Sequence, residues 1–150
     1  MASSPQQRIE ADIKTALKAG DKERLGTLRL LLTELKNERI KRHAEVDEPG
    51  FAAITRRAIK QREEAVEQYR LGNRPELAAK EEAEAAILAS YLPPALGEEE
   101  IRARIAEFVT AKGLSGAASL GVVMKESRAL FGGAADNATV SRIAREVLGS

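Results

Sequence analysis

The sequence predicts an all-α protein in two parts: a helical N-terminal domain of about four helices over residues 1–92 and a three-helix tail domain over residues 93–150. Apolar residues recur at the three- and four-residue spacing of helices, and no stretch sustains the alternation of strands. The pair Pro93-Pro94 separates the parts, because adjacent prolines remove two backbone donors and restrict two φ angles. An ordinary interhelical turn inside one bundle is the alternative interpretation of this pair.

Start and stop signals define the first two predicted helices. Ser4 is placed as an N-cap, with Pro5 at the first helical position and Gln7 completing a capping box. Gly20 ends the first helix and Asp21 caps the second. The predicted apolar faces are Ile9, Ile13, Ala16 and Leu17 in the first helix, and Leu25, Leu28, Leu31, Leu32, Leu35 and Ile40 in the second.

The next two helices are predicted from two helix-breaking segments. The run Asp47-Glu48-Pro49-Gly50 is expected to end the second helix, and the third is expected to run from about Phe51 to Leu71. Pro75 starts the fourth. The predicted apolar residues are Phe51, Ile54, Ala58, Ala65 and Tyr69 in the third helix, and Leu77, Ile87, Leu88 and Tyr91 in the fourth. The charged runs between them are interpreted as solvated faces.

Three further helices are predicted after the proline pair. The acidic residues 98–100 suit the first turn of a helix, where the dipole favours negative charge, and Lys112-Gly113 ends that helix. Ser119 caps the next, which ends near Gly132-Gly133, and Asp136 or Asn137 caps the last. The middle helix of the three contains Val122, Val123 and Met124. The predicted buried residues are Ile101, Ile105, Phe108 and Val109 in the helix before it and Val140, Ile143, Ala144, Val147 and Leu148 in the helix after it.

Composition excludes several classes of protein. The 150 residues contain no cysteine, which excludes disulfides and thiolate metal sites. The N-terminal stretch, residues 1–5, has no apolar segment of the secretory type, and no apolar run approaches the length that spans a membrane. We therefore expect a soluble, cytoplasmic protein that is not associated with a membrane.

The residues that usually carry catalysis are scarce. The chain has neither a phosphate-binding P-loop nor a dinucleotide-binding glycine motif. His43 is the only histidine and is interpreted as a surface side chain, so a zinc site of the usual kind is excluded. Glu81, Glu82 and Glu84 are interpreted as a solvated face. We expect no cofactor, no metal and no catalytic residue.

Basic side chains are concentrated locally, although the net charge of the chain is only +1. They gather between residues 24 and 42 and between residues 51 and 74, where they outnumber the acids. A nucleic-acid site on this protein is therefore expected as a local stripe. The candidates for RNA binding are Arg29, Lys36, Arg39, Arg42, Arg56, Arg57, Lys60, Lys125 and Arg128.

Four groups of sequence strings are distinctive when taken together. They are Thr27-Leu28-Arg29-Leu30-Leu31-Leu32 with Leu35-Lys36-Asn37-Glu38; Lys60-Gln61-Arg62-Glu63-Glu64-Ala65 with Gln68-Tyr69 and Gly72-Asn73-Arg74; Lys80-Glu81-Glu82-Ala83-Glu84 with Tyr91-Leu92-Pro93; and Gly121-Val122-Val123-Met124 with Gly133-Ala134-Ala135-Asp136. Together these strings resemble the YqeY family, over nearly the whole chain. The last group is similar to the GatB/YqeY tail module, which also ends the B subunit of tRNA-dependent amidotransferases.

This resemblance implies a link to glutamine-dependent transamidation of tRNA, a carbon–nitrogen ligase reaction. The part of the B subunit that resembles a catalytic, ATP-using domain has no counterpart here, so the resemblance implies an accessory protein that binds tRNA or the translation machinery. The sequence departs from the family at Val122 and Ala134, where basic residues are usual. These departures favour the alternative, an adaptor that docks on a protein partner through a neutral tail domain. An enzyme of amide transfer acting alone is the third hypothesis.

Overall fold

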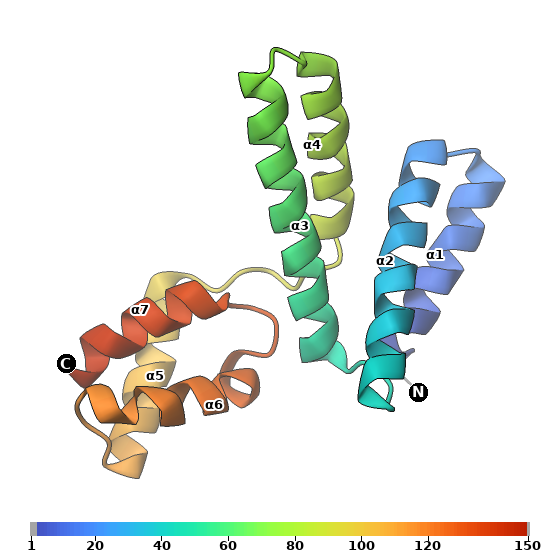
Figure 1. The fold of residues 1–150 in the computed structure, drawn as a ribbon. Coiled ribbons are helices and arrows are strands. Elements are labelled where there is room, and N and C mark those ends of the chain that lie inside the picture. Colours follow the sequence, from blue (N-terminus) through green and yellow to red (C-terminus); the bar gives the residue numbers. More distant parts are fainter. Residues whose placement is uncertain (1–2, 150) are drawn as a thin grey trace. The chain divides into compact units, whose positions relative to one another are not determined.

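The computed structural model describes residues 3–149, and every regular element in that range is helical (Figure 1). The all-α prediction is therefore confirmed. Part of the N-terminal stretch considered above, Met1 and Ala2, lies outside the described residues, as does Ser150. The elements are α1 (Pro5–Ala19), α2 (Lys22–Arg42), α3 (Glu48–Leu71), α4 (Pro75–Ala89), α5 (Glu98–Lys112), the short 3₁₀ helix η1 (Ala117–Ser119), α6 (Leu120–Phe131) and α7 (Asn137–Leu148).

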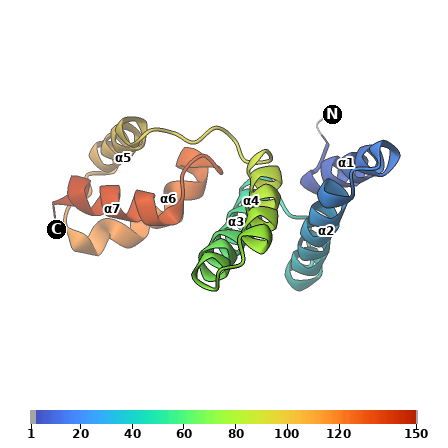
Figure 2. The same ribbon diagram turned by 90° about the horizontal axis from the view of Figure 1, so that it is seen from above.

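The helices group into two compact units, which meet in the chain between Leu92 and Pro93. In the N-terminal unit α1 packs on α2 and α3 packs on α4, so that two helical hairpins form the unit (Figures 1 and 2). In the C-terminal unit α7 packs on both α5 and α6. Whether the two units are independent domains stays a prediction.

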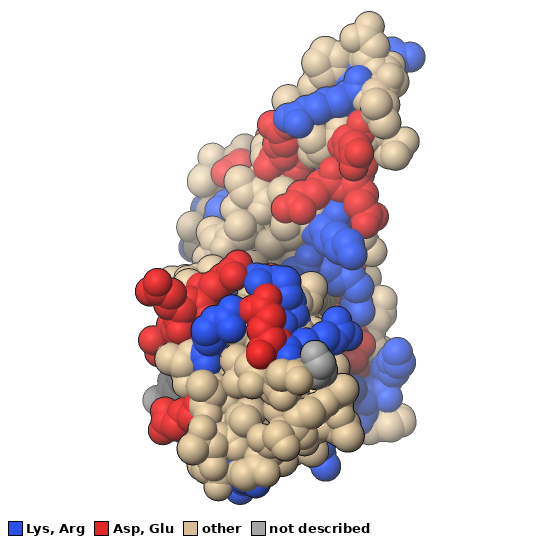
Figure 3. Space-filling view, turned by 90° about the vertical axis from the view of Figure 1, so that its left-hand side faces the viewer, with Lys and Arg blue, Asp and Glu red and all other residues tan. Residues whose placement is uncertain are grey.

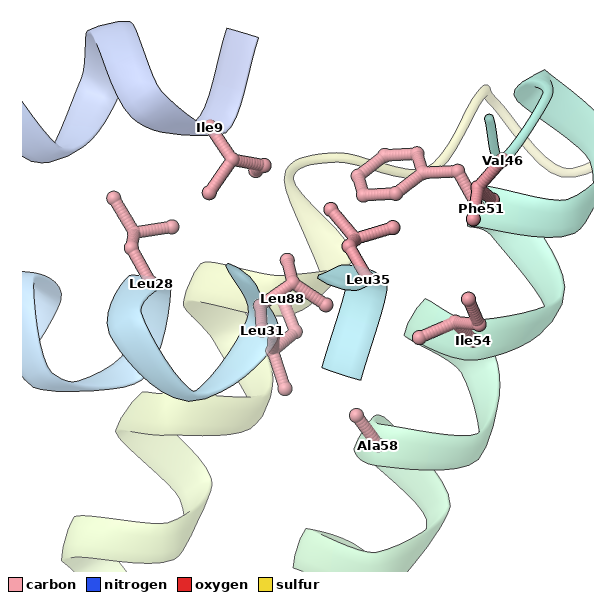
Figure 4. Packing of buried hydrophobic residues seen from close by; sticks show 9 residues of the cluster. All are labelled: Ile9, Leu28, Leu31, Leu35, Val46, Phe51, Ile54, Ala58 and Leu88. Carbon is pink, nitrogen blue, oxygen red and sulfur yellow. The ribbon is translucent and has the colours of Figure 1, made fainter. Parts of the chain in front are cut away.

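One apolar core joins all four helices of the N-terminal unit. Phe51 of α3 and Leu88 of α4 are buried with the leucines on one side of α2 and with Ile9 of α1 (Figure 4). Each large aliphatic or aromatic side chain buried in this way contributes roughly 1.5–3 kcal/mol to stability. The buried residues of this cluster are Ile9, Leu28, Leu31, Leu35, Val46, Phe51, Ile54, Ala58 and Leu88.

The C-terminal unit has a separate core and several surface ion pairs between α5 and α7. Its buried residues are Ile101, Ile105, Val109, Val123, Phe131, Val140, Ile143, Ala144 and Leu148. On the surface, Arg142 of α7 lies 2.7 Å from Glu98 of α5, and Arg102 pairs with Glu146. The pKa of the Glu146 carboxyl is lowered, chiefly by its hydrogen bond from Arg102. These exposed pairs link α5 to α7 beside a core that does most of the stabilisation.

Two of the predicted helix boundaries were wrong. The second helix ends at Arg42, where His43 adopts a left-handed φ of 57° as the C-cap, rather than at the Asp47–Gly50 run. That run begins α3 instead: the Asp47 carboxylate accepts a hydrogen bond from the Gly50 N–H at 2.8 Å. Proline fits the first turn of a helix as well as a turn between helices, so the composition of the run did not distinguish the two.

Of the two residues that cap the tail helices in the prediction, one forms a capping hydrogen bond and the other does not. Asp136 caps α7 by accepting a hydrogen bond from the Thr139 N–H at 2.9 Å. Ser119 precedes α6 as predicted, but its side chain makes no capping hydrogen bond there. Its hydroxyl instead donates to the Ser115 carbonyl at 3.0 Å, because the preceding 3₁₀ turn brings that carbonyl within reach.

Four apolar residues of the predicted helices are exposed, among them Leu17 and Ile40 of the predicted apolar faces. The exposed fraction is 59% for Leu17, 71% for Ile40, 38% for Leu77 and 47% for Val122. Each neighbouring helix covers only part of a helix surface, so an apolar stripe wider than the contact leaves its edge residues in solvent.

Candidate nucleic-acid interface

One side of α2 carries an exposed, mainly basic stripe. Arg29, Lys36, Ile40 and His43 fall within a sector of about 60° around the helix axis, given a rotation of about 100° per residue. All four side chains are exposed. The buried leucines of α2, Leu28, Leu31 and Leu35, occupy a different sector. The packing of α2 against the core therefore turns this stripe toward solvent, and we call it the α2 flank.

The C-terminal end of the α2 flank borders an open hollow of about 650 Å³. Arg39 lies in the hollow beside Lys36, and its guanidinium is 3.9 Å from the Glu45 carboxylate. An ion pair of this length on the surface neutralises little of the charge. The residues that line the hollow are Gln6, Lys36, Arg39, Ile40, His43, Ala44 and Glu45.

The nine predicted RNA-binding residues do not form one surface. Arg29, Lys36 and Arg39 belong to the α2 flank and its hollow. Arg42 points to another side of α2, where its Nε donates to Glu38 at 2.8 Å. The remaining candidates form two other groups, on α3 and on α6: Arg56, Arg57 and Lys60; and Lys125 and Arg128.

The two other groups have a different electrostatic setting. Arg57 and Lys60 are exposed and Arg56 is half-buried, and acidic residues follow them along α3. On α6, Lys125 and Arg128 are exposed near Val122, so the helix presents a mixture of apolar and basic residues. The α2 flank therefore concentrates basic residues without a matching run of acids, whereas the α3 group does not.

Sequence reasoning missed several residues of the hollow. Gln6 comes from the first turn of α1, and Glu45 comes from the connection after α2. Ile40 was assigned to the core, although it falls outside the sector of Leu28, Leu31 and Leu35. That difference in helical angle is visible in the sequence and could have indicated an exposed position. The contribution of Gln6 depends on how α1 packs on α2, for which the sequence holds no local signal.

Two other features are absent from the described residues. Within residues 3–149, no helix has the length and apolar character needed to cross a bilayer. In the same range, no group of three or more histidine, cysteine, aspartate or glutamate side chains is arranged to hold a metal ion.

Comparison with known proteins identifies relatives over most of the chain. The family model described as Yqey-like protein matches residues 6–148. A protein of Lachancea thermotolerans is 32% identical over 105 residues, which cover 68% of this chain and 56% of the relative. A protein of Pyrenophora tritici-repentis is 29% identical over 147 residues, which cover 95% of this chain and 80% of the relative. The chain thus spans little more than half the length of the first relative.

Both relatives bear the name "Altered inheritance of mitochondria protein 41, mitochondrial". These names contradict the cytoplasmic location expected from the sequence. That expectation used the lack of an apolar N-terminal segment, which bears on secretory leaders but not on the amphipathic leaders of mitochondrial proteins. The names mention neither an amidotransferase nor RNA, so both of those expectations stay predictions. The family model covers nearly the whole chain, and the chain therefore belongs to the Yqey-like protein family.

Proposed function

We propose that this protein is an RNA-binding accessory factor that holds tRNA, or RNA of the translation machinery, along the α2 flank and performs no chemical step itself. The observation that carries the proposal is the exposed basic stripe of α2, in which Arg29 and Lys36 make no ion pair within the described part of the chain. The link to tRNA transamidation comes from the resemblance of the tail to the amidotransferase module.

The spacing of the stripe suits a phosphate backbone. Arg29 and Lys36 are two turns apart, which separates their Cα atoms by about 10 Å along the helix. Arg39 places a third cation next to Lys36 in the hollow. Cations in such a row displace the counterions condensed on RNA, and that release supplies most of the sequence-independent affinity. The amide of Gln6, also in the hollow, adds a hydrogen-bonding group without charge.

Binding to bulk tRNA across a salt series tests this proposal. We expect affinity to fall steeply with salt, with a slope of roughly 0.7–0.9 per phosphate contacted. Arg29→Ala and Lys36→Ala should each weaken binding and reduce that slope by about one. Lys112→Ala removes an exposed lysine at the end of α5 and serves as the matched control for loss of charge. Absence of binding at low salt, or equal losses in the control, would reject the α2 flank.

A protein-binding adaptor is the second candidate. It is supported by the 47% exposure of Val122 on α6, at a position where the resemblance leads one to expect a basic residue. An apolar helix face can dock in a groove of a partner. This function predicts a complex with a protein that survives high salt, is lost with Val122→Asp and is retained with Lys125→Ala. Loss of the complex at moderate salt would count against it.

A further inference from the structure

The hollow at the end of the α2 flank has two ends of opposite charge. Lys36 and Arg39 bring positive charge to it from the last two turns of α2. At the other end the chain has left the helix at its C-cap, His43, and Glu45 contributes an exposed carboxylate. The C-terminal end of a helix carries partial negative charge, so the dipole of α2 adds to the charge of Glu45. A phosphate is therefore favoured beside Lys36 and disfavoured beside Glu45.

Between these ends the wall of the hollow is apolar. Ile40 and Ala44 both line it, and the Ile40 side chain is 71% exposed. Ile40 lies one turn after Lys36, about 6 Å from it along the helix axis. The volume of about 650 Å³ is in the range of sites that hold small ligands. An aliphatic surface next to cations suits the flat ring of a ligand that also carries phosphate.

Two side chains in the hollow are suited to accept hydrogen bonds. Gln6 Nε2 donates to Glu10 at 2.9 Å, so the amide oxygen is the group that Gln6 can offer to a ligand. The Glu45 carboxylate is only an acceptor, and its distance of 3.9 Å from Arg39 is longer than a hydrogen bond. A carboxylate accepts from the exocyclic amino group of cytosine and repels the carbonyl oxygen that uracil has at the same position.

The basic group on α3 lacks this combination. Acidic side chains lie close to basic ones over the α3–α4 hairpin in Figure 3. Ile54 and Ala58, which stand on either side of the two arginines of this group in the sequence, are buried in the core. A base next to those arginines would therefore meet neither of these apolar side chains, whereas a base next to Lys36 meets Ile40.

We propose that the hollow holds one unpaired base of the RNA, with Ile40 and Glu45 as the residues that determine specificity. This inference rests on the proposed function, because Arg29 and Lys36 hold the phosphates that lead to the hollow. The base packs against Ile40, and Glu45 accepts a hydrogen bond from its exocyclic amino group. In a duplex the base is stacked and its edge is paired, so the α2 flank selects single-stranded RNA. Cytosine is preferred to uracil, which has nearly the same shape but lacks the amino group.

Fluorescence anisotropy at low salt, with the full chain, tests the role of Glu45. The probes are oligocytidylate, oligouridylate and an RNA duplex of matched length. We expect the cytidylate to bind roughly three- to tenfold more tightly than the uridylate. Glu45→Gln should bring this ratio close to one, because an amide can donate to the uracil oxygen as well as accept from the cytosine amine. Glu107→Gln changes the net charge equally at an exposed position of α5 and should preserve the ratio.

Variants of Ile40 test the apolar wall. Ile40→Ala should weaken the binding of oligocytidylate by roughly fivefold and leave duplex binding unchanged. Ile40→Phe provides a larger flat surface and should strengthen the binding of oligocytidylate, a gain that a misfolded protein could not produce. Leu30→Ala removes another exposed aliphatic side chain of α2, one that does not line the hollow, and should change neither affinity.

The outcomes separate this inference from the proposed function. Equal binding of the two single strands, or a preference that Glu45→Gln leaves unchanged, would overturn the base site. Equal binding of duplex and single strands, with losses in Arg29→Ala and Lys36→Ala but none in Ile40→Ala, would also overturn it while the RNA-binding function stands. Binding of none of the three RNAs at low salt would reject both the base site and the proposed function.

Discussion

The phenol of Tyr91 donates a hydrogen bond of 2.5 Å to the Asp12 carboxylate, and this contact joins the end of the α4 segment to α1. Arg24 of α2 donates to the same phenolic oxygen at 3.3 Å. The Tyr91 ring also meets Phe51 of α3 edge-on, with 6.2 Å between ring centroids. One side chain thereby contacts all three other helices of the N-terminal unit, two residues before the proline pair.

Replacement of Tyr91 by phenylalanine is expected to lower the free energy of unfolding by about 1.5 kcal/mol, since a hydrogen bond to a charged group is lost while the ring contacts remain. Urea unfolding followed by circular dichroism measures the change. Tyr69→Phe is the matched control, because the hydroxyl of this half-buried tyrosine has no hydrogen-bond partner within the described residues. Equal losses in the two variants would show that the Asp12 contact contributes nothing.

The same contact predicts a loss of stability in alkali. Burial, and then the hydrogen bond to Asp12, raise the pKa of Tyr91 to about 12 from the usual 10. The folded state therefore retains the phenolic proton at pH values where the unfolded state loses it. The resulting stabilisation is complete below pH 10 and disappears as the pH rises through 12. Unfolding midpoints across this range should fall more steeply for the original protein than for Tyr91→Phe; parallel curves would contradict the assignment.

Arg62 and Glu84 form a largely buried ion pair between α3 and α4, and we predict that it is sensitive to the loss of one partner. The Arg62 Nε lies 3.8 Å from Glu84 Oε2, and the side chains are 13% and 14% exposed. Burial, with Glu81 nearby, raises the pKa of the Glu84 carboxyl. Arg62→Ala leaves that carboxylate buried without its partner and should cost about 2–3 kcal/mol in urea unfolding.

Two further variants test whether the lost stability comes from the unpaired Glu84 carboxylate rather than from the removal of any arginine. Arg70→Ala removes an exposed pair with Glu82 on the same hairpin and should change stability by less than about 0.5 kcal/mol. The double variant Arg62→Met/Glu84→Met removes both charges and should be more stable than Arg62→Ala alone. A double variant as unstable as Arg62→Ala would mean that packing of the arginine stem, rather than its charge, is what matters.

The caps of the tail helices provide a prediction for the C-terminal unit. Asp136→Ala removes the hydrogen bond to the Thr139 N–H and should destabilise this unit by about 1 kcal/mol. Ser119→Ala changes the N-cap residue of α6, whose side chain makes no capping bond, and should cost much less. Hydrogen exchange of amides in α6 and α7 measures both effects separately from the N-terminal unit. A larger loss from Ser119→Ala would contradict the capping geometry.

Much of the fold could be predicted because helix starts are local. The Ser4 side chain accepts from the Gln7 N–H at 3.2 Å, and the Gln7 side chain accepts from the Ser4 N–H at 3.0 Å, as the capping box requires. Asp21 caps α2 in the predicted place. The start of α3 was misplaced because Asp47-Glu48-Pro49-Gly50 suits a turn and a first helical turn equally well. Only the contact of Asp47 with Gly50 distinguishes them.

The candidate site was predictable in its residue types but not in its grouping. Arg42 projects from a different side of α2 than Lys36 and Arg39, and its guanidinium pairs with the Glu38 carboxylate. Gln6 joins the hollow only because α1 packs against α2.

Local signals in the sequence predict the helical class of this protein, the N-caps Ser4, Asp21 and Asp136 and the positions at which the charges fall around each helix. These properties depend on residues within four positions of one another. The tertiary structure alone decided which sector of each helix is covered, and so which of Leu17, Ile40 and Val122 stay in solvent. It also decided which charges meet across helices. Those outcomes depend on contacts between segments distant in the chain, for which local spacing carries no information.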